Sequence, residues 1–247
     1  MRNKPCAPVT GVNNAILGIG CATALMMAGL SGQAQAQAQD TSKHKLGFNA
    51  AITSDYVFRG VSQTLEEPAI QAGVDVTHGM FYTGAWASNV DFGDGATDAE
   101  VDLYAGVRPQ FAGFDWDAGI IAYLYTGQPD RADYNYAELK VAASRVVGQA
   151  TVGAAVYYSP DFFGTSEDEA TYAEINAGFP VHERVTVSGA LGHQWVSSDL
   201  DYLTWNLGAA WQASEHLAVD VRYHDTDGHD LGQIYDSRVV LSLKAVL

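Results

Sequence analysis

The sequence predicts an all-β protein, an antiparallel transmembrane β-barrel of about 12 strands. Three observations carry this prediction. Apolar and polar side chains alternate in short runs from Leu46 to the end of the chain, long and short connections alternate between the runs, and an export signal precedes them. Successive side chains on a strand face opposite sides, so each run has an apolar face and a polar face. Many such runs without a helical stretch indicate a sheet closed on itself.

Residues 1–38 are typical of an export signal. Arg2 and Lys4 give a basic start, residues 15–30 are apolar and small, and small-x-small cleavage sites lie within residues 34–38. The alternative is a membrane anchor, which the sequence disfavours because the apolar stretch is short for a membrane-spanning helix and rich in Gly and Ala. We therefore expect the segment to be removed on export.

The expected mature chain, residues 39–247, forms one outer-membrane barrel domain. Cys6 and Cys21 both precede it, which leaves no disulfide and no thiolate metal site. Removing Arg2 and Lys4 moves the formal net charge from −16 to −18. Such an acidic chain lacks the basic patches of a nucleic-acid binder, so nucleic acid is excluded as a partner.

Twelve strands are expected, each near the ~9–11 residues that a tilted strand needs to cross a bilayer. An even number leaves both chain ends on the periplasmic side. The expected bounds are 45–58, 69–78, 81–90, 99–108, 114–125, 134–144, 149–158, 170–179, 185–195, 202–211, 217–224 and 235–247.

The connections between these strands fall into two classes. Long outer loops and short periplasmic turns are the asymmetry of membrane barrels, whereas a soluble sandwich has no reason to sort its connections. The longer, mostly acidic connections are 91–98, 126–133, 159–169, 196–201 and 225–234. The short ones are 79–80, 109–113, 145–148, 180–184 and 212–216.

Aromatic residues gather near the expected strand ends, where rings with a polar tip favour the two membrane interfaces. The alternative is the ordinary preference of aromatic residues for strands. The inner-end set is Phe81, Tyr82, Phe111, Phe114, Trp116, Phe179 and Trp211. The outer-end set is Tyr56, Phe58, Tyr123, Tyr125, Tyr134, Tyr136, Tyr157, Tyr158, Tyr172, Trp195, Tyr202 and Tyr223.

Three segments carry a family resemblance. Residues 54–64 (SDYVFRGVSQT) resemble the opening motif of the TorF-like family of outer-membrane porins, and residues 68–75 (PAIQAGVD) and 86–89 (WASN) resemble its next two strands. The resemblance implies an outer-membrane barrel with a channel role, and it supplies no substrate. The alternation continues to Leu247. Outer-membrane strands of this kind usually end on an apolar, often aromatic residue that the barrel-assembly machinery reads, so Leu in place of an aromatic residue is a mild departure.

Strand phase assigns the faces. Around the family motif, Ile52, Tyr56 and Phe58 fall on the lipid side, and Asp55 and Arg59 on the other, where they are expected to form a structural ion pair. Arg or Lys on the lipid side would cost about 2–4 kcal/mol near the midplane, so charges belong in the lumen. The expected lumen residues are Asp55, Arg59, Asp75, Glu100, Asp102, Arg108, Asp115, Asp117, Glu138, Lys140, Glu174, Asp220, Arg222, Arg238 and Lys244.

Two interpretations of these charges stay open. They line a watery pore, in which nine acids against six bases give a mild preference for cations, or they pair with one another and brace a plugged interior. The first predicts passive diffusion of small hydrophilic solutes or ions through a barrel surrounded by outer-membrane lipid and lipopolysaccharide. The second predicts a non-conducting structural or surface-interaction barrel that acts through its acidic outer loops.

Catalysis and metal binding have weaker support. His193 has Ser188, Ser197 and Ser198 nearby in sequence, but no spacing indicates a nucleophile held by an oriented base, so no enzyme is predicted. Residues 224–230 (HDTDGHD) are similar to an oxygen-rich calcium loop but lack its full spacing and its distal Glu. We expect an acidic outer loop there, with no metal site and no cofactor.

Overall fold

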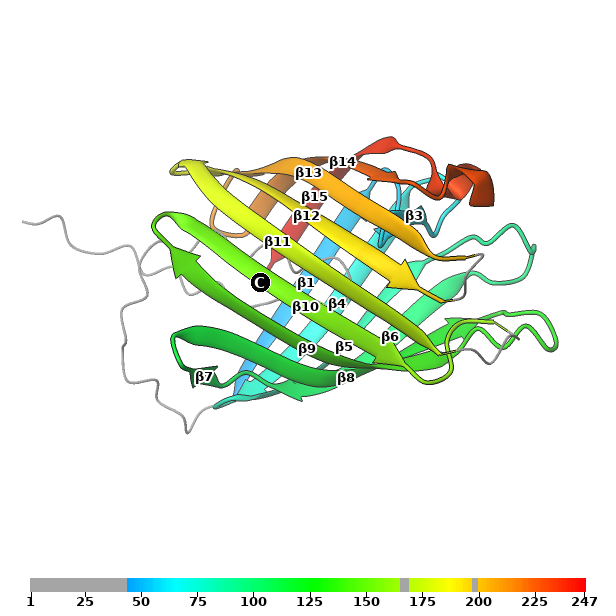
Figure 1. Cartoon of the computed structure of the whole chain (residues 1–247), viewed down its shortest axis with the longest axis horizontal. Coiled ribbons are helices and arrows are strands. Elements are labelled where there is room, and N and C mark those ends of the chain that lie inside the picture. Colours follow the sequence, from blue (N-terminus) through cyan, green and yellow to red (C-terminus); the bar gives the residue numbers. More distant parts are fainter. Residues whose placement is uncertain (1–43, 165–168, 197–199) are drawn as a thin grey trace, which may run out of the picture.

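The computed structural model describes residues 44–164, 169–196 and 200–247. The expected export signal lies outside these residues. Twelve long strands form a closed antiparallel barrel, as predicted (Figure 1). They are β1 (Lys45–Thr53), β4 (Ala69–His78), β5 (Phe81–Asn89), β6 (Ala99–Val107), β8 (Phe114–Thr126), β9 (Tyr136–Val147), β10 (Ala150–Ser159), β11 (Ala170–His182), β12 (Val185–Trp195), β13 (Tyr202–Gln212), β14 (Leu217–Thr226) and β15 (Arg238–Val246).

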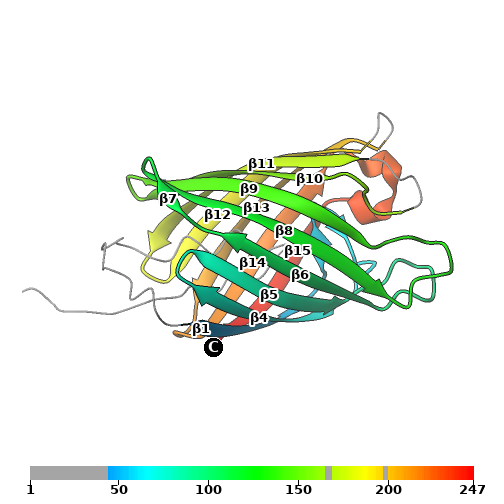
Figure 2. The same cartoon turned by 90° about the horizontal axis from the view of Figure 1, so that it is seen from below.

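Each long strand pairs with its neighbours in the chain, and the first strand closes the barrel on the last. Thr53 of β1 lies opposite Ser242 of β15, and β6 pairs directly with β8. The short β7 (Gln110–Phe111) forms a small extension on β8. All strands are strongly tilted, as a closed barrel requires (Figures 1 and 2).

The connections sort by length as expected. Long ones gather at one end of the barrel, shown at the right in Figures 1 and 2, and tight turns gather at the other. The last long connection holds two 3-10 helices, η2 (His229–Leu231) and η3 (Gln233–Tyr235), so the last strand starts at Arg238 rather than at residue 235. Within the described ranges, no helix is long and apolar enough to span a membrane.

The outer face of the barrel is apolar. Ile70 on β4 is 69% exposed and Ile175 on β11 is 62% exposed, and the pattern repeats on other strands with Leu103, Leu139, Leu207 and Leu241. A closed barrel leaves no strand edge with unpaired backbone groups, and an apolar outer belt suits a hydrocarbon surrounding. This arrangement is that of a barrel that spans a membrane.

The first strand differs from the expected 45–58. β1 ends at Thr53, and residues 54–64 turn into the barrel, where β2 (Val57–Phe58) and β3 (Val61–Ser62) form a small antiparallel pair. We call residues 54–64 the inner hairpin. Its two central residues, Arg59 and Gly60, both have positive φ, +49° and +86°. A tight two-residue hairpin turn of type I′ needs this conformation at both positions.

Two predictions about which side chains face the lipid are therefore wrong. Tyr56 is 1% exposed and Phe58 packs inside, so neither faces lipid. The outer aromatic girdle also fails in large part, because the tyrosines in this set at positions 56, 123, 125, 136, 172 and 202 are buried inside the barrel. Part of the inner-end set does face outward: Phe81, Phe111, Phe179 and Trp211 are exposed.

Candidate functional site in the barrel interior

The inner hairpin crosses the barrel from one wall to the opposite wall. It leaves the wall at β1, and Arg59 at its tip reaches Glu138 on β9 and Gln194 on β12. In the closed order of twelve long strands, β10 lies diametrically opposite β1, and β9 to β12 are centred near it. The hairpin is therefore a bar across the outer half of the lumen.

Arg59 anchors the tip through charge, hydrogen bonds and ring contacts. Its two terminal nitrogens donate to the two carboxylate oxygens of Glu138 at 2.8 and 2.7 Å, and one also donates to Gln194 Oε1 at 3.0 Å. The guanidinium lies 4.8 and 4.4 Å from the ring centres of Tyr157 and Tyr172. Bidentate geometry and cation–π contacts of this kind are the strong form of a buried ion pair.

Gly60, next to Arg59, is pressed against the wall. A Cβ built on Gly60 would collide with the side chains of Thr204 on β13 and Thr226 on β14. Close approach and positive φ both require glycine at this position. The tip is thus wedged between strands on two sides of the barrel.

The base of the hairpin is held by a second ion pair. Asp55 accepts hydrogen bonds from the hydroxyls of Ser62 and Thr64, at 2.7 and 3.0 Å, and from Arg238 Nη1 at 3.0 Å. The expected ion pair between Asp55 and Arg59 is wrong. The two side chains bind partners on different walls because the chain turns inward between them instead of continuing as a strand.

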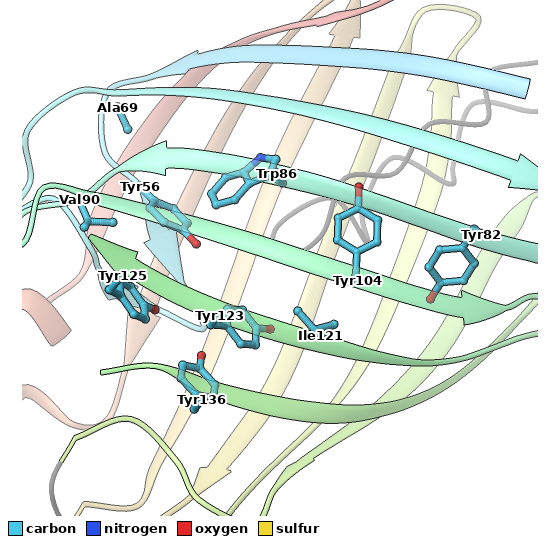
Figure 3. Close-up of a cluster of buried hydrophobic side chains, with 10 residues drawn as sticks. All are labelled: Tyr56, Ala69, Tyr82, Trp86, Val90, Tyr104, Ile121, Tyr123, Tyr125 and Tyr136. Carbon is cyan, nitrogen blue, oxygen red and sulfur yellow. The ribbon is translucent and has the colours of Figure 1, made fainter. Parts of the chain in front are cut away.

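On one side of the hairpin, the interior is filled with aromatic rings (Figure 3). We call the inner faces of β5, β6, β8 and β9 the aromatic side. Tyr56 of the hairpin packs edge-on against Trp86 of β5 at 5.4 Å, and Tyr123 stacks on Tyr136 at 4.4 Å. The remaining buried members are Tyr82, Tyr104, Ile121 and Tyr125.

On the other side, the interior is polar and hollow. We call the inner faces of β11 to β15 the polar side. A cavity of about 120 Å³ lies against it, beside the hairpin and part of the opposite wall. The polar-side residues that line this cavity are Tyr172, Glu174, Ala190, Thr204, Asn206, Asp220, Arg222, His224, Val240, Ser242 and Lys244.

Arg222 organises the polar side. It donates to Asp220 on its own strand at 3.1 and 3.3 Å, to Asn206 Oδ1 at 2.8 Å and to Ser188 Oγ at 2.9 Å. Lys244 is held more loosely, with its ammonium 4.0 Å from Asp220. Glu174 accepts hydrogen bonds from Tyr172 and Asn176, both at 3.0 Å, and faces the cavity.

A further charged group lies nearer the end of the barrel that carries the tight turns. Asp117 accepts from Lys140 Nζ at 2.9 Å, from Arg108 Nε at 3.1 Å and from the Tyr82 hydroxyl at 2.6 Å. Asp115, two residues earlier, is exposed at the strand start and accepts from Gln110. Arg108 lies just after β6 rather than in it.

Three further acids complete the predicted set. Asp75 on β4 accepts a hydrogen bond from the Tyr104 hydroxyl at 2.7 Å. Glu100 accepts one from the Tyr56 hydroxyl at 3.0 Å. Asp102 is fully buried, and neither of its oxygens has a hydrogen-bond partner among the described residues.

Sequence reasoning missed several residues that shape this interior. Tyr123, Tyr172, Asn206 and His224 line the cavity, and Gln194 binds Arg59, so all five lie on the inner face with the predicted acids. Strand phase could have found them, because Tyr123 shares its parity with Asp117, Tyr172 with Glu174, and His224 with Asp220. The first three residues of the expected loop 224–230 also belong to a strand, since β14 extends to Thr226.

Catalysis by a serine with His193 as its base, and metal binding, receive no geometric support among the described residues. Ser188 lies on the inner face, where it binds Arg222, while His193 is five positions away on the opposite face of β12 and stacks on Trp195. Ser197 and Ser198 lie outside the described residues. Within the described part of the chain, no group of three His, Cys, Asp or Glu side chains could hold a metal ion.

The solved structures that superpose on this chain include porins and an outer membrane channel. The KdgM porin superposes with a TM-score of 0.56 at 8% identity, over 81% of this chain and 97% of that one. The COG4313 outer membrane channel from Pseudomonas putida F1 gives 0.51 at 12% identity, over 86% and 99%. The NanC porin gives 0.51 at 9% identity, over 82% and 98%. At these identities the likeness is one of fold.

No curated protein matches the sequence. A family model does match, and it covers residues 37–246 of the 247. The description of this family does not mention porins, so the resemblance of residues 54–89 to the TorF-like family stays a prediction. With a model that spans nearly all of the barrel, the chain belongs to the family described as "Bacterial protein of unknown function (Gcw_chp)".

Proposed function

We propose that this protein is an outer-membrane channel for small hydrophilic solutes, and that the inner hairpin controls how much of the lumen is open. One observation carries the proposal: a polar cavity of about 120 Å³ runs beside a hairpin that belongs to a loop and not to the wall. An element outside the strand ladder can move without breaking the barrel. The surroundings we propose are outer-membrane lipid and lipopolysaccharide, with insertion by the barrel-assembly machinery.

The porin structures with the same fold support a channel role. One of the similar structures is "KdgM porin in complex with disordered oligogalacturonate", with a TM-score of 0.54 at 8% identity over 81% of this chain and 97% of that one. That porin holds an oligosaccharide. For this chain we propose small hydrophilic solutes as a class.

We further propose a mild preference for cations. Ion pairs engage Asp55, Asp117, Glu138 and Asp220. Glu174, by contrast, faces the cavity with two neutral donors and no cation partner among the described residues. Unpaired carboxylates along a solute path attract cations.

Planar-bilayer recording tests the channel. Purified protein should give stepwise conductance, and a variant with residues 57–62 replaced by a Gly-Ser linker should give larger steps. Complete electrical silence of both proteins at high loading would overturn the proposal. Larger steps in the variant alone would support it, because they place the conduction path through the lumen that the hairpin crosses.

A non-conducting barrel is the second candidate, and the span of the hairpin across the whole lumen favours it. In that case the hairpin braces the barrel, and the outer loops carry the function. Swelling of proteoliposomes in small sugars separates the two candidates. Uptake that depends on residues 57–62 supports the channel, and no uptake with either protein supports the structural barrel.

A further inference from the structure

Two neighbouring carboxyl groups lie sealed beneath the inner hairpin. Glu100 and Asp102 are consecutive residues on the inner face of β6, and they are 1% and 0% exposed. Neither oxygen of Asp102 has a hydrogen-bond partner among the described residues. Burial of a carboxylate that accepts no hydrogen bond is unfavourable, so this group needs an explanation.

The groups around the pair offer no compensating charge. Asp102 lies opposite Trp86 on β5 and Tyr123 on β8, and Glu100 lies opposite Ser88 and Tyr125. From the hairpin, Tyr56 donates its hydroxyl to Glu100 at 3.0 Å. Figure 3 shows Tyr56 beside Trp86 and facing the tyrosines of β8 and β9.

The charged groups on β9 and at the tip of the hairpin are already paired with each other. Glu138 on β9 adds a further negative charge on this side, and Arg59 binds both of its oxygens. Tyr136, also on β9, stacks on Tyr123 and completes the ring of phenols. The hairpin cation is thus neutralised by Glu138 and leaves Glu100 and Asp102 without a counter-ion of their own.

Two adjacent buried carboxylates cannot both stay ionised without donors or cations. A proton removes the conflict, because a carboxylic acid is neutral and can donate a hydrogen bond to its neighbour. A metal ion would need more ligands, and no cluster of three such side chains exists among the described residues. The proton is the ligand that fits this enclosed space.

We propose that Glu100 and Asp102 form a proton-binding site that holds the inner hairpin in place, and that loss of the proton releases the hairpin. Ionisation of both groups brings repulsion and a demand for water. Tyr56 is the part of their cover that does not belong to the strand ladder, so it yields first. The site should therefore be closed at low pH and open at high pH.

Infrared spectroscopy of the full chain in lipid tests the site itself. A protonated carboxyl group has a C=O stretching band that ionised carboxylates lack. We expect this band in the wild type at neutral pH, its loss at high pH, and its loss at neutral pH in Asp102→Asn, where the new amide can donate to an ionised Glu100. Asp220→Asn, whose carboxylate is paired with Arg222, should leave the band unchanged. Absence of the band from the wild type at neutral pH would overturn the proposal.

A spin label on the hairpin tests the release. Residues 39–247 contain no native cysteine, so Gln63→Cys alone takes the nitroxide. We expect the label to become mobile as pH rises. We expect Asp102→Asn to keep it immobile throughout, because the new amide stays neutral and can donate a hydrogen bond to Glu100 at every pH. Identical pH profiles for the two proteins would contradict the proposal.

Conductance separates this inference from the channel function on which its effect depends. If the band and the label respond to pH while both proteins stay electrically silent, the proton site stands and the channel proposal fails. If steps appear but neither the band nor the label responds, the channel stands and the proton site fails.

Discussion

The aromatic side and the polar side of the lumen hold the hairpin in different ways. On the aromatic side, Tyr56 packs against Trp86 and the space is filled by rings. On the polar side, hydrogen bonds centred on Arg222 line a cavity that stays empty of side chains. Packing is lost abruptly when a ring is removed, whereas a hydrated polar wall tolerates change. The aromatic side therefore packs closely against the hairpin, whereas the polar side binds it through Gln194 and Arg238 and leaves the space in which we propose that solutes pass.

The largest effect should come from the tip of the hairpin, which both sides share. Arg59→Ala leaves Glu138 buried without its partner, so we expect the free energy of unfolding to fall by about 4 kcal/mol. Single-channel steps should also become larger. The free energy of unfolding is measured by denaturant titration, in which gel electrophoresis separates the folded protein from the unfolded protein by its mobility. The size of the single-channel steps is measured in planar bilayers.

Two matched variants sharpen this result. Arg59→Lys keeps the charge but not the bidentate geometry, so it should fall between the wild type and Arg59→Ala. Arg145→Ala removes an exposed arginine whose guanidinium lies 5.0 Å from the Phe114 ring centre, and it should change stability little. Equal effects of Arg59→Ala and Arg145→Ala would mean that the hairpin tip is not anchored as described.

The next effect compares packing on the two sides directly. Trp86→Ala on the aromatic side should lower the free energy of unfolding by about 3 kcal/mol through the void that it leaves. Asn206→Ala on the polar side removes one acceptor of Arg222 and should cost about 1 kcal/mol, because water can reach the cavity. Denaturant titration in lipid vesicles measures both. The contrast between the sides fails if the second cost equals the first.

A smaller effect concerns charge along the cavity. Glu174→Lys inserts a positive charge into the polar side, so the reversal potential under a salt gradient should shift toward anion preference. Glu183→Lys makes the same charge change in the exposed turn between β11 and β12 and serves as the control. A shift of equal size in both variants would place the selective region outside the polar side.

The smallest effect lies in the outer loop that precedes β15. His229 Nε2 donates a hydrogen bond of 2.9 Å to Asp225 Oδ1, and this contact raises the pKa of His229 above its ordinary value of 6.5. Because the folded pKa is the higher one, the contact stabilises the loop fully below pH 6.5 and loses this effect as pH rises through the folded pKa. NMR titration should give a midpoint above 6.5, and Asp225→Asn should lower it. A midpoint that is unchanged in this variant would rule out the contact.

The barrel wall was predictable from local pattern. Strand bounds agree to within a few residues, because an alternating run and the turn residues that end it are adjacent in the chain. Residues 54–58 are the exception. Their alternation continues that of β1, yet Arg59 and Gly60 form a two-residue turn with positive φ, and this signal marks a hairpin and not a longer strand.

The pairing of charges was not predictable in the same way. Asp55 and Arg59 are four residues apart and looked like partners, but Asp55 binds Arg238, 183 positions away, and Arg59 binds Glu138, 79 positions away. The alternation along a strand predicts whether a side chain faces the lumen or the lipid. It does not predict the height of that side chain in the barrel or which residues lie across the lumen from it.

By itself, the sequence determined a closed antiparallel barrel with an apolar outer face, charged residues set apart on the opposite phase, and long and short connections at opposite ends. These properties follow from a period of two and from turn positions, which are local. Only the tertiary structure decided that the first outer loop enters the lumen, that it divides the interior into an aromatic side and a polar side, and that Glu100 and Asp102 lie sealed beneath it. Those outcomes depend on contacts between strands far apart in the chain, and such contacts exist only once the barrel has closed.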